Sequence, residues 1–199
     1  MTRRSLPLYA FLLLFGAAAG LPRAANAQDA AAFVGNLGTQ AIQVLGPSVS
    51  PAARVARFRE LFSADFDVAG IARFVLGRYW NVATPQQQQE FLRLFQEYIV
   101  QAYSARLGQY GGEPFRVTGT RPGAEETVVN SQILRPSGPV QVDWYLVGGP
   151  GGYKITDVYV GGISMKATQR DEFAAVIQRN GGQIDGLLAQ LRQKLAAVP

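Results

Sequence analysis

Residues 62–103 read FSADFDVAGIARFVLGRYWNVATPQQQQEFLRLFQEYIVQAY, and the rest of the chain is predicted to cover this stretch. Its second half predicts one long helix, with Thr84 as N-cap, Pro85 in the first helical position and an end near Gly108. A helix lying on one flat core needs an apolar stripe of only about 100°. The stripe here is wider, so we expect apolar material, either protein or ligand, on two sides of it. It comprises Phe91, Leu92, Leu94, Phe95, Tyr98, Ile99, Ala102, Tyr103 and Leu107.

The first residues have the pattern of a cleavable export signal. Arg3 and Arg4 precede an apolar run over 6–21, and Ala25-Asn26-Ala27 is a small-residue cleavage motif. We predict a signal peptide over 1–27 and one domain over 28–199. A retained membrane anchor is the alternative, but the run is short and interrupted by glycine and proline. The paired arginines fit an ordinary basic segment as well as a twin-arginine signal, and we favour the ordinary segment.

Charge and composition exclude several classes of function. Three of the nineteen basic residues and none of the fourteen acidic ones lie in residues 1–27, so the remaining chain carries a net charge of +2 rather than +5. Its basic residues are scattered, which argues against a nucleic-acid partner. The sequence contains no cysteine and no histidine, which excludes disulfides, thiol catalysis, histidine-based triads and nearly every transition-metal site. We therefore expect no cofactor and no metal.

Helices are predicted on the N-terminal side of the long helix. Apolar residues recur at helical spacing over 29–45, and a second helix opens at Ser50-Pro51. Asp67 is placed to cap a short helix that Gly77 closes. The chain therefore begins with a helical layer.

Strands are predicted after Gly111, followed by two more helices. Runs of β-branched and aromatic residues cover 115–120, 126–134, 140–147 and 153–165. Short turns rich in glycine and proline join them, so neighbouring strands must be antiparallel. The last two helices are separated by Asn180-Gly181-Gly182, and Thr168–Asp171 has the form of a capping box. The fold class is α+β: N-terminal helices, a curved antiparallel four-stranded (or longer) sheet and C-terminal helices.

Four carboxylates and one glycine pair are candidates for special roles. Asp65, Asp67, Asp143 or Asp157, beside a tyrosine in an apolar cavity, would suit an acid-base enzyme. The structural alternative is stronger, since Asp67 fits an N-cap, Asp143 falls on the polar face of its strand and Asp157 precedes a turn. Gly161-Gly162 lies inside a strand pattern, where it predicts a bulge or the close approach of another group.

The chain has a surplus of large apolar side chains whose spacing fits either a filled core or the wall of a cavity. Several of them belong to motifs that resemble the MlaC family of periplasmic phospholipid carriers, also known as toluene-tolerance proteins. The motifs are Asp65-Phe66-Asp67, Ile71–Trp80, Ala83-Thr84-Pro85, Val142-Asp143-Trp144, Ile155–Val158, Gly162–Met165 and Arg170–Phe173. The resemblance spans nearly the whole chain after the signal.

The resemblance implies a non-enzymatic periplasmic shuttle. Its ligand would be a phospholipid, or a hopanoid if the chain belongs to the hopanoid-associated branch of the family. Its partners would be an outer-membrane lipoprotein component and an inner-membrane ABC transporter with an MCE domain. The departures are Trp144 in place of a tyrosine, Tyr153 in place of a tryptophan and Gly161 in place of an acidic residue. They bear on ligand preference more than on fold.

Together, the pattern and the resemblance predict an apolar lipid cavity between the sheet and the helical layer. An enzyme with a carboxylate and a tyrosine in the same cavity, and an adaptor with a fully packed core, are the alternatives. The predicted lipid-binding residues are Phe62, Phe66, Ile71, Phe74, Val75, Tyr79, Trp80, Phe91, Phe95, Tyr98, Ile99, Tyr103, Val129, Val142, Trp144, Leu146, Val158, Val160 and Ile163.

Overall fold

The computed structural model describes residues 23–45, 48–123, 125–149 and 151–197. Most of the predicted signal peptide, residues 1–22, lies outside the described residues, as does the predicted helix end at Gly46-Pro47. No helix in the described part of the chain is long and apolar enough to cross a membrane. The elements are α1 (Arg23–Leu45), α2 (Pro51–Asp65), α3 (Val68–Leu76), the 3₁₀ helix η1 (Gly77–Asn81), α4 (Pro85–Leu107), β1 (Phe115–Pro122), β2 (Thr127–Arg135), β3 (Gly138–Gly149), β4 (Gly152–Val160), β5 (Ile163–Ser164), α5 (Met165–Arg179) and α6 (Ile184–Ala196).

The predicted helix starts are confirmed at three positions and wrong at one. Ser50, Asp67 and Thr84 each accept a hydrogen bond from a backbone N–H in the first turn of α2, α3 and α4. For α5, however, the N-cap is Ser164, whose hydroxyl accepts from the Ala167 N–H. The expected capping box at Thr168 lies inside that helix, because the strand before it ends earlier than its β-branched pattern suggests.

The sheet is antiparallel, with its strands in the order β1-β2-β3-β4-β5. The predicted run over 153–165 is two strands, because Gly161 and Gly162 form a tight turn with φ of 59° and 82°. The expected bulge at these glycines is therefore wrong. A two-residue hairpin turn of type I′ has a positive φ at both central residues, a backbone conformation that glycine adopts without steric cost.

The bulge in this part of the chain lies at Thr156 in β4. Leu146 pairs with Ile155 and Tyr145 with Asp157, which leaves Thr156 as an extra residue. Because one residue is inserted, the alternation of side chains shifts by one across it. Ile155 faces the helices before the bulge, and Val158 and Val160 face them after it.

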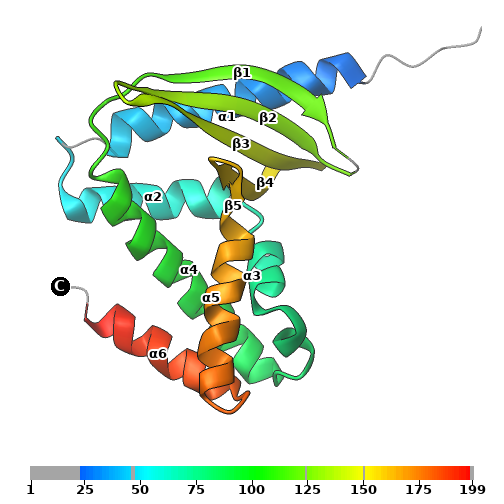
Figure 1. The fold of residues 1–199 in the computed structure, drawn as a ribbon, viewed down its shortest axis with the longest axis vertical. Coiled ribbons are helices and arrows are strands. Elements are labelled where there is room, and N and C mark those ends of the chain that lie inside the picture. Colours follow the sequence, from blue (N-terminus) through cyan, green and yellow to red (C-terminus); the bar gives the residue numbers. More distant parts are fainter. Residues whose placement is uncertain (1–22, 46–47, 124, 150, 198–199) are drawn as a thin grey trace, which may run out of the picture.

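The described residues form two separate apolar cores (Figure 1). One lies among α2 to α6, where Phe173 packs edge-on against Phe91 and Phe95 of α4. The other lies where α1 crosses the inner face of the sheet, with Val34 against Val129, Leu146 and Ile155. In Figure 1 the sheet, α1 and α2 occupy the upper end of the molecule and α3 to α6 the lower end.

Strand β4 joins the sheet to the helical layer through three successive polar contacts. The Lys154 ammonium donates to the Ala64 carbonyl in the last turn of α2, and the Asp67 N–H donates 2.9 Å to the Ile155 carbonyl. The Asp157 carboxylate accepts from the Ser164 hydroxyl at 2.5 Å and from the Lys166 N–H at 3.1 Å. A cation thus meets the C-terminus of α2 and an anion meets the N-terminus of α5, as the helix dipoles favour.

Replacing Asp157 tests whether this junction holds the two layers together. Asp157→Asn keeps the size of the side chain but removes its charge and one acceptor oxygen, and should lower the free energy of unfolding by about 1–3 kcal/mol. Asp143→Asn is the matched control, because Asp143 accepts from Asn130 and Gln141 on the outer face of the sheet. Urea titration measures both, and an equal loss in the two variants would contradict the assigned role of Asp157.

Candidate functional site

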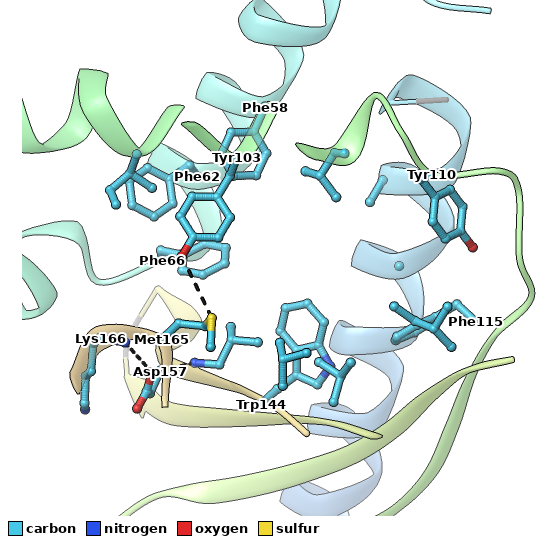
Figure 2. A pocket seen from close by; sticks show the side chains of 18 of the residues that line it. Phe58, Phe62, Phe66, Tyr103, Tyr110, Phe115, Trp144, Asp157, Met165 and Lys166 are labelled. Carbon is cyan, nitrogen blue, oxygen red and sulfur yellow. Dashed lines mark hydrogen bonds between the residues drawn. The ribbon is translucent and has the colours of Figure 1, made fainter. Parts of the chain in front are cut away.

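An apolar cavity of about 380 Å³ separates the two cores (Figure 2). This volume falls within the range of about 300–1,000 Å³ that small-molecule sites occupy. Aromatic rings of α2 and α4, among them Phe62, Phe66 and Tyr103, form one wall, and Trp144 lies on the sheet opposite them. The complete lining is Gly38, Ala41, Ile42, Phe58, Phe62, Phe66, Ile71, Phe95, Ile99, Tyr103, Leu107, Tyr110, Phe115, Ile133, Arg135, Val140, Val142, Trp144, Asp157, Val158, Val160, Met165, Lys166 and Gln169.

The wide apolar arc of α4 divides between the cavity and the helical core. Phe95, Ile99, Tyr103 and Leu107, each four residues from the last, form a ridge along the cavity wall. Phe91 and its neighbours turn to α5 and α6 instead. The helix therefore has apolar surroundings on two sides, the helical core on one and the cavity on the other.

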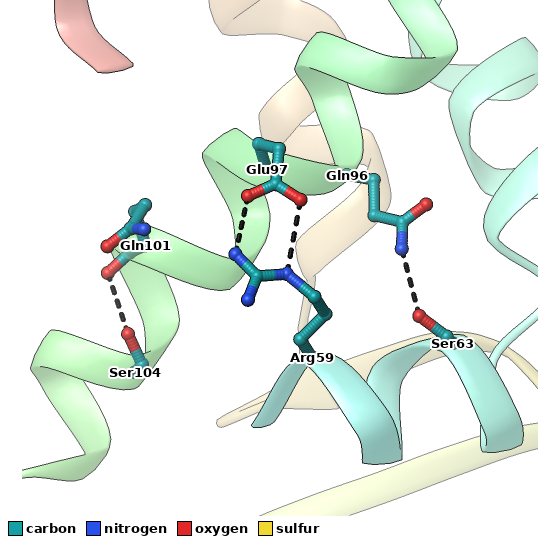
Figure 3. Close-up of polar contacts among 6 residues, drawn as sticks. All are labelled: Arg59, Ser63, Gln96, Glu97, Gln101 and Ser104. Carbon is teal, nitrogen blue, oxygen red and sulfur yellow. Dashed lines mark hydrogen bonds and ion pairs between the residues drawn. The ribbon is translucent and has the colours of Figure 1, made fainter. Parts of the chain in front are cut away.

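Polar contacts hold α2 and α4 side by side as the helical wall of the cavity (Figure 3). The Arg59 guanidinium donates to both oxygens of Glu97, at 2.6 and 3.2 Å, and the Gln96 amide donates 2.8 Å to the Ser63 hydroxyl. Partly exposed pairs of this kind contribute about 1 kcal/mol or less. The two parallel hydrogen bonds between Arg59 and Glu97 fix the relative orientation of the helices more than they add stability.

Ten of the nineteen predicted lipid-binding residues line the cavity, and they come from α2 to α4 and the sheet. The helices α2, α3 and α4, with the residue that follows α2, supply Phe62, Phe66, Ile71, Phe95, Ile99 and Tyr103. The sheet supplies Val142, Trp144, Val158 and Val160. The structure therefore brings together residues that are nearly 100 positions apart in the sequence.

The structure places the other nine predicted residues elsewhere. Val75, Tyr79, Trp80, Phe91 and Tyr98 pack in the core among the helices, because α5 and α6 cover that side of α3 and α4. Val129 and Leu146 pack under α1, which covers part of the inner sheet face. Phe74 and Ile163 lie partly exposed, at 37% and 60% of their full surface. None of these nine side chains is among the residues that line the cavity.

Sequence reasoning missed the contribution of α1 to the cavity. Gly38, Ala41 and Ile42 line it, and a Cβ atom at Gly38 would lie 2.4 Å from the ring of Phe115. The signal was present as small residues at positions 35, 38 and 41, which recur at helical spacing and allow close packing. Leu107 was predicted only as part of the apolar arc of the long helix, and Asp157 only as a candidate carboxylate of the enzyme alternative. Also missed were Phe58, Tyr110, Phe115, Ile133, Arg135, Val140, Met165, Lys166 and Gln169.

Two of the polar cavity residues match the carboxylate and tyrosine of the enzyme alternative. Burial raises the pKa of Tyr103, and the nearby Glu172, Tyr98 and Asp157 raise it further against the opposing effect of Arg106. The Tyr103 hydroxyl lies 3.9 Å from the sulfur of Met165, which is a weak partner. Asp157 is already engaged by the start of α5 and by the Val158 N–H at 2.8 Å. Its oxygens are therefore used to join the two layers.

The other three candidate carboxylates, Asp65, Asp67 and Asp143, have contacts that fit structural roles. Asp67 caps α3, and Asp143 lies on the outer face of the sheet. Burial raises the pKa of Asp65, while the nearby Lys154 opposes that shift. Within the described residues, no group of three or more acidic side chains lies close enough to hold a metal ion.

Comparison with known proteins identifies the family. The family model described as MlaC protein matches residues 39–193, which include both walls of the cavity. The chain belongs to the MlaC family. It is 30% identical over 122 residues to toluene tolerance protein ttg2D of Pseudomonas putida, a match covering 60% of this chain and 57% of that protein.

Two further relatives are named for phospholipids. The intermembrane phospholipid transport system binding protein MlaC of Haemophilus influenzae is 22% identical over 125 residues, covering 60% of this chain and 58% of that one. This chain thus matches somewhat more than half the length of each curated relative. A solved phospholipid-binding protein from Ralstonia solanacearum, in complex with a phospholipid, shares the fold with a TM-score of 0.71 at 24% identity. That match covers 84% of this MlaC-family chain and 97% of the other.

A pair of substitutions on the inner sheet face tests whether the space is a cavity or a packed core. Val142 borders the cavity and is 4% exposed, whereas Val129 is completely buried under α1. Val142→Phe should change the free energy of unfolding by less than about 1 kcal/mol, while Val129→Phe overpacks a filled core and should cost about 1–3 kcal/mol. Urea titration of the two variants measures the difference. Equal destabilisation would mean that the space at Val142 is filled.

Proposed function

We propose that this protein is a periplasmic phospholipid carrier that encloses acyl chains in the cavity between the sheet and the helical layer. The observation that carries the proposal is the cavity itself, whose wall is almost wholly aromatic and aliphatic. Membership of the MlaC family supports it, as do the phospholipid-binding relatives from Haemophilus influenzae and Ralstonia solanacearum. The ten predicted residues that border the cavity are the proposed acyl-chain contacts.

The energetics favour an enclosed site for such a ligand. Each buried CH₂ group contributes about 0.8 kcal/mol, so two acyl chains represent on the order of 20 kcal/mol of apolar transfer. Chains lying on an open surface would lose much of that free energy to water. Exchange between a bilayer and a dry cavity is nearly neutral, because both are apolar, so the carrier itself has no chemical step to perform.

Export and partners complete the proposal. Residues 1–27 act as a cleaved signal peptide, and residues 28–199 form the single carrier domain. The protein exchanges lipid with the outer membrane on one side and with an inner-membrane ABC transporter bearing an MCE domain on the other. The direction of transport is set by these partners, because a near-neutral exchange has no direction of its own.

Mass spectrometry of the protein purified without detergent from the envelope of its own organism tests the proposal. We expect a native mass that exceeds the mass of the chain from residue 28 onward by that of one diacyl phospholipid. Organic extraction should release the same lipid. A triterpenoid in its place would assign the ligand to the hopanoid branch of the family. A lipid-free mass that stays unchanged after incubation with phospholipid vesicles would contradict the carrier function.

A polar substitution in the cavity wall tests which residues hold the chains. Ile99→Gln places an amide against the acyl chains, where an unpaired polar group costs about 1–3 kcal/mol, so lipid retention should fall by roughly tenfold or more. Leu92→Gln, on the same helix but against the helical core, is the matched control. Lipid phosphorus per mole of folded protein is the measurement. Full retention in a folded Ile99→Gln variant would remove Ile99 from the proposed site.

A further inference from the structure

Three charged side chains border the cavity: Arg135, Asp157 and Lys166. Two of them have their partners outside the apolar space. Asp157 receives its hydrogen bonds from Val158 and from the start of α5. The Lys166 ammonium lies 4.8 Å from the ring centre of Phe74, and Figure 2 shows its side chain extending away from the cavity. Arg135 is the remaining charge at the border, since Asp157 is used at the layer junction and Lys166 is turned away from the cavity.

Arg135 ends β2 at the border of the cavity, with 46% of its side chain exposed. Its Nε atom lies 3.6 Å from Oε1 of Glu113, which is an ion pair but too long for a good hydrogen bond. The other carboxylate oxygen of Glu113 accepts 2.9 Å from the Gly111 N–H, so Glu113 is held in place. A fixed anion and a partly free cation therefore lie side by side where the cavity meets solvent.

Tyr110 supplies a third polar group at this end. Its ring lines the cavity, and its hydroxyl is the one buried side-chain polar atom in the described residues without a hydrogen-bond partner. Burial raises the pKa of Tyr110, Glu113 raises it further and Arg135 lowers it, so both charges act on this hydroxyl. A buried hydroxyl without a partner is costly. In this structure the hydroxyl is enclosed by protein, so a ligand oxygen would satisfy it only if the Tyr110 ring turns toward the cavity border.

We propose that Arg135, Glu113 and Tyr110 form the subsite for a zwitterionic phospholipid headgroup of the phosphoethanolamine type. The Arg135 guanidinium binds the phosphate and the Glu113 carboxylate binds the ammonium, while the Tyr110 ring turns so that its hydroxyl donates to a phosphate or ester oxygen. The inference rests on the proposed carrier function and adds the class of headgroup to it.

The neutral pair is the reason for choosing a zwitterion. An isolated arginine would favour any phosphate, including that of a purely anionic headgroup. Here Glu113 lies next to that arginine and repels an anion that brings no cation with it, which discriminates between headgroups by unfavourable contact. A zwitterionic headgroup finds an opposite charge for each of its own: Arg135 for the phosphate and Glu113 for the ammonium.

Competition for lipid from one mixed vesicle tests the proposal. Delipidated protein is incubated with vesicles of phosphatidylethanolamine, phosphatidylglycerol and diacylglycerol carrying identical acyl chains, then separated and extracted. We expect phosphatidylethanolamine to be enriched over phosphatidylglycerol relative to the vesicle. Glu113→Gln should raise the share of phosphatidylglycerol about twofold to fivefold, since it removes the repelling charge. Arg135→Gln should lower both phospholipids against diacylglycerol about fivefold, the size expected of a partly exposed ion pair.

Controls separate this effect from a general change of surface charge. Arg116→Gln and Glu60→Gln replace exposed residues that do not border the cavity and should leave the lipid ratios unchanged. Tyr110→Phe should raise the melting temperature of the lipid-free protein by about 2–4 °C, since it removes an unpaired buried hydroxyl, and should lower phospholipid retention. Unaltered retention in that variant would remove the hydroxyl from the subsite.

The outcomes distinguish this inference from the carrier function on which it rests. Lipid uptake whose ethanolamine-to-glycerol ratio is the same in the wild type and in Glu113→Gln would overturn the headgroup subsite and leave the carrier intact. Failure of the wild type to take up any of the three lipids would overturn both.

Discussion

The architecture depends on strand β4, whose polar contacts attach the sheet to the helical layer alongside the apolar contacts of Leu61 and Phe66 with the sheet core. Lys154 reaches the end of α2, Ile155 accepts from the backbone of Asp67, and Asp157 receives the start of α5. Since these contacts are polar and directional, they fix the separation of the layers as well as joining them. Apolar contacts alone would favour a smaller separation, because hydrophobic attraction has no preferred geometry.

The cavity follows from that fixed separation. Each layer has its own core, so neither needs the other in order to bury most of its apolar surface. Between them remain aromatic and aliphatic faces that cannot meet, and their contact with water is unfavourable in proportion to their area. An apolar ligand removes that unfavourable surface. In the proposed carrier function, binding of acyl chains therefore requires no special chemistry, and selectivity would depend on the few polar groups at the border.

Asp157 shows how a carboxylate that shares a cavity with a tyrosine is used in a structural role. It borders the same space as Tyr103, the arrangement expected of an acid-base pair. Its oxygens accept hydrogen bonds from two backbone N–H groups and a hydroxyl, however, and it lies at the positive end of a helix. The structural demand at the layer junction accounts for an acidic residue at this position, buried beside an apolar cavity.

The sequence by itself determined the α+β class, the ends of most helices and the polar outer face of β3. These depend on local chemistry: Ser50, Asp67 and Thr84 cap the helices that follow them, and the period-two pattern of 140–147 assigns its faces. Only the tertiary structure decided which apolar residues border the cavity. Phe91 and Phe95 lie on the same arc of α4 and both meet Phe173 of α5, but only Phe95 also borders the cavity. Likewise, Val129 and Val142 share the inner sheet face, and α1 covers one of them. Periodicity shows which side chains avoid water, but whether protein or ligand excludes that water depends on elements distant in the sequence.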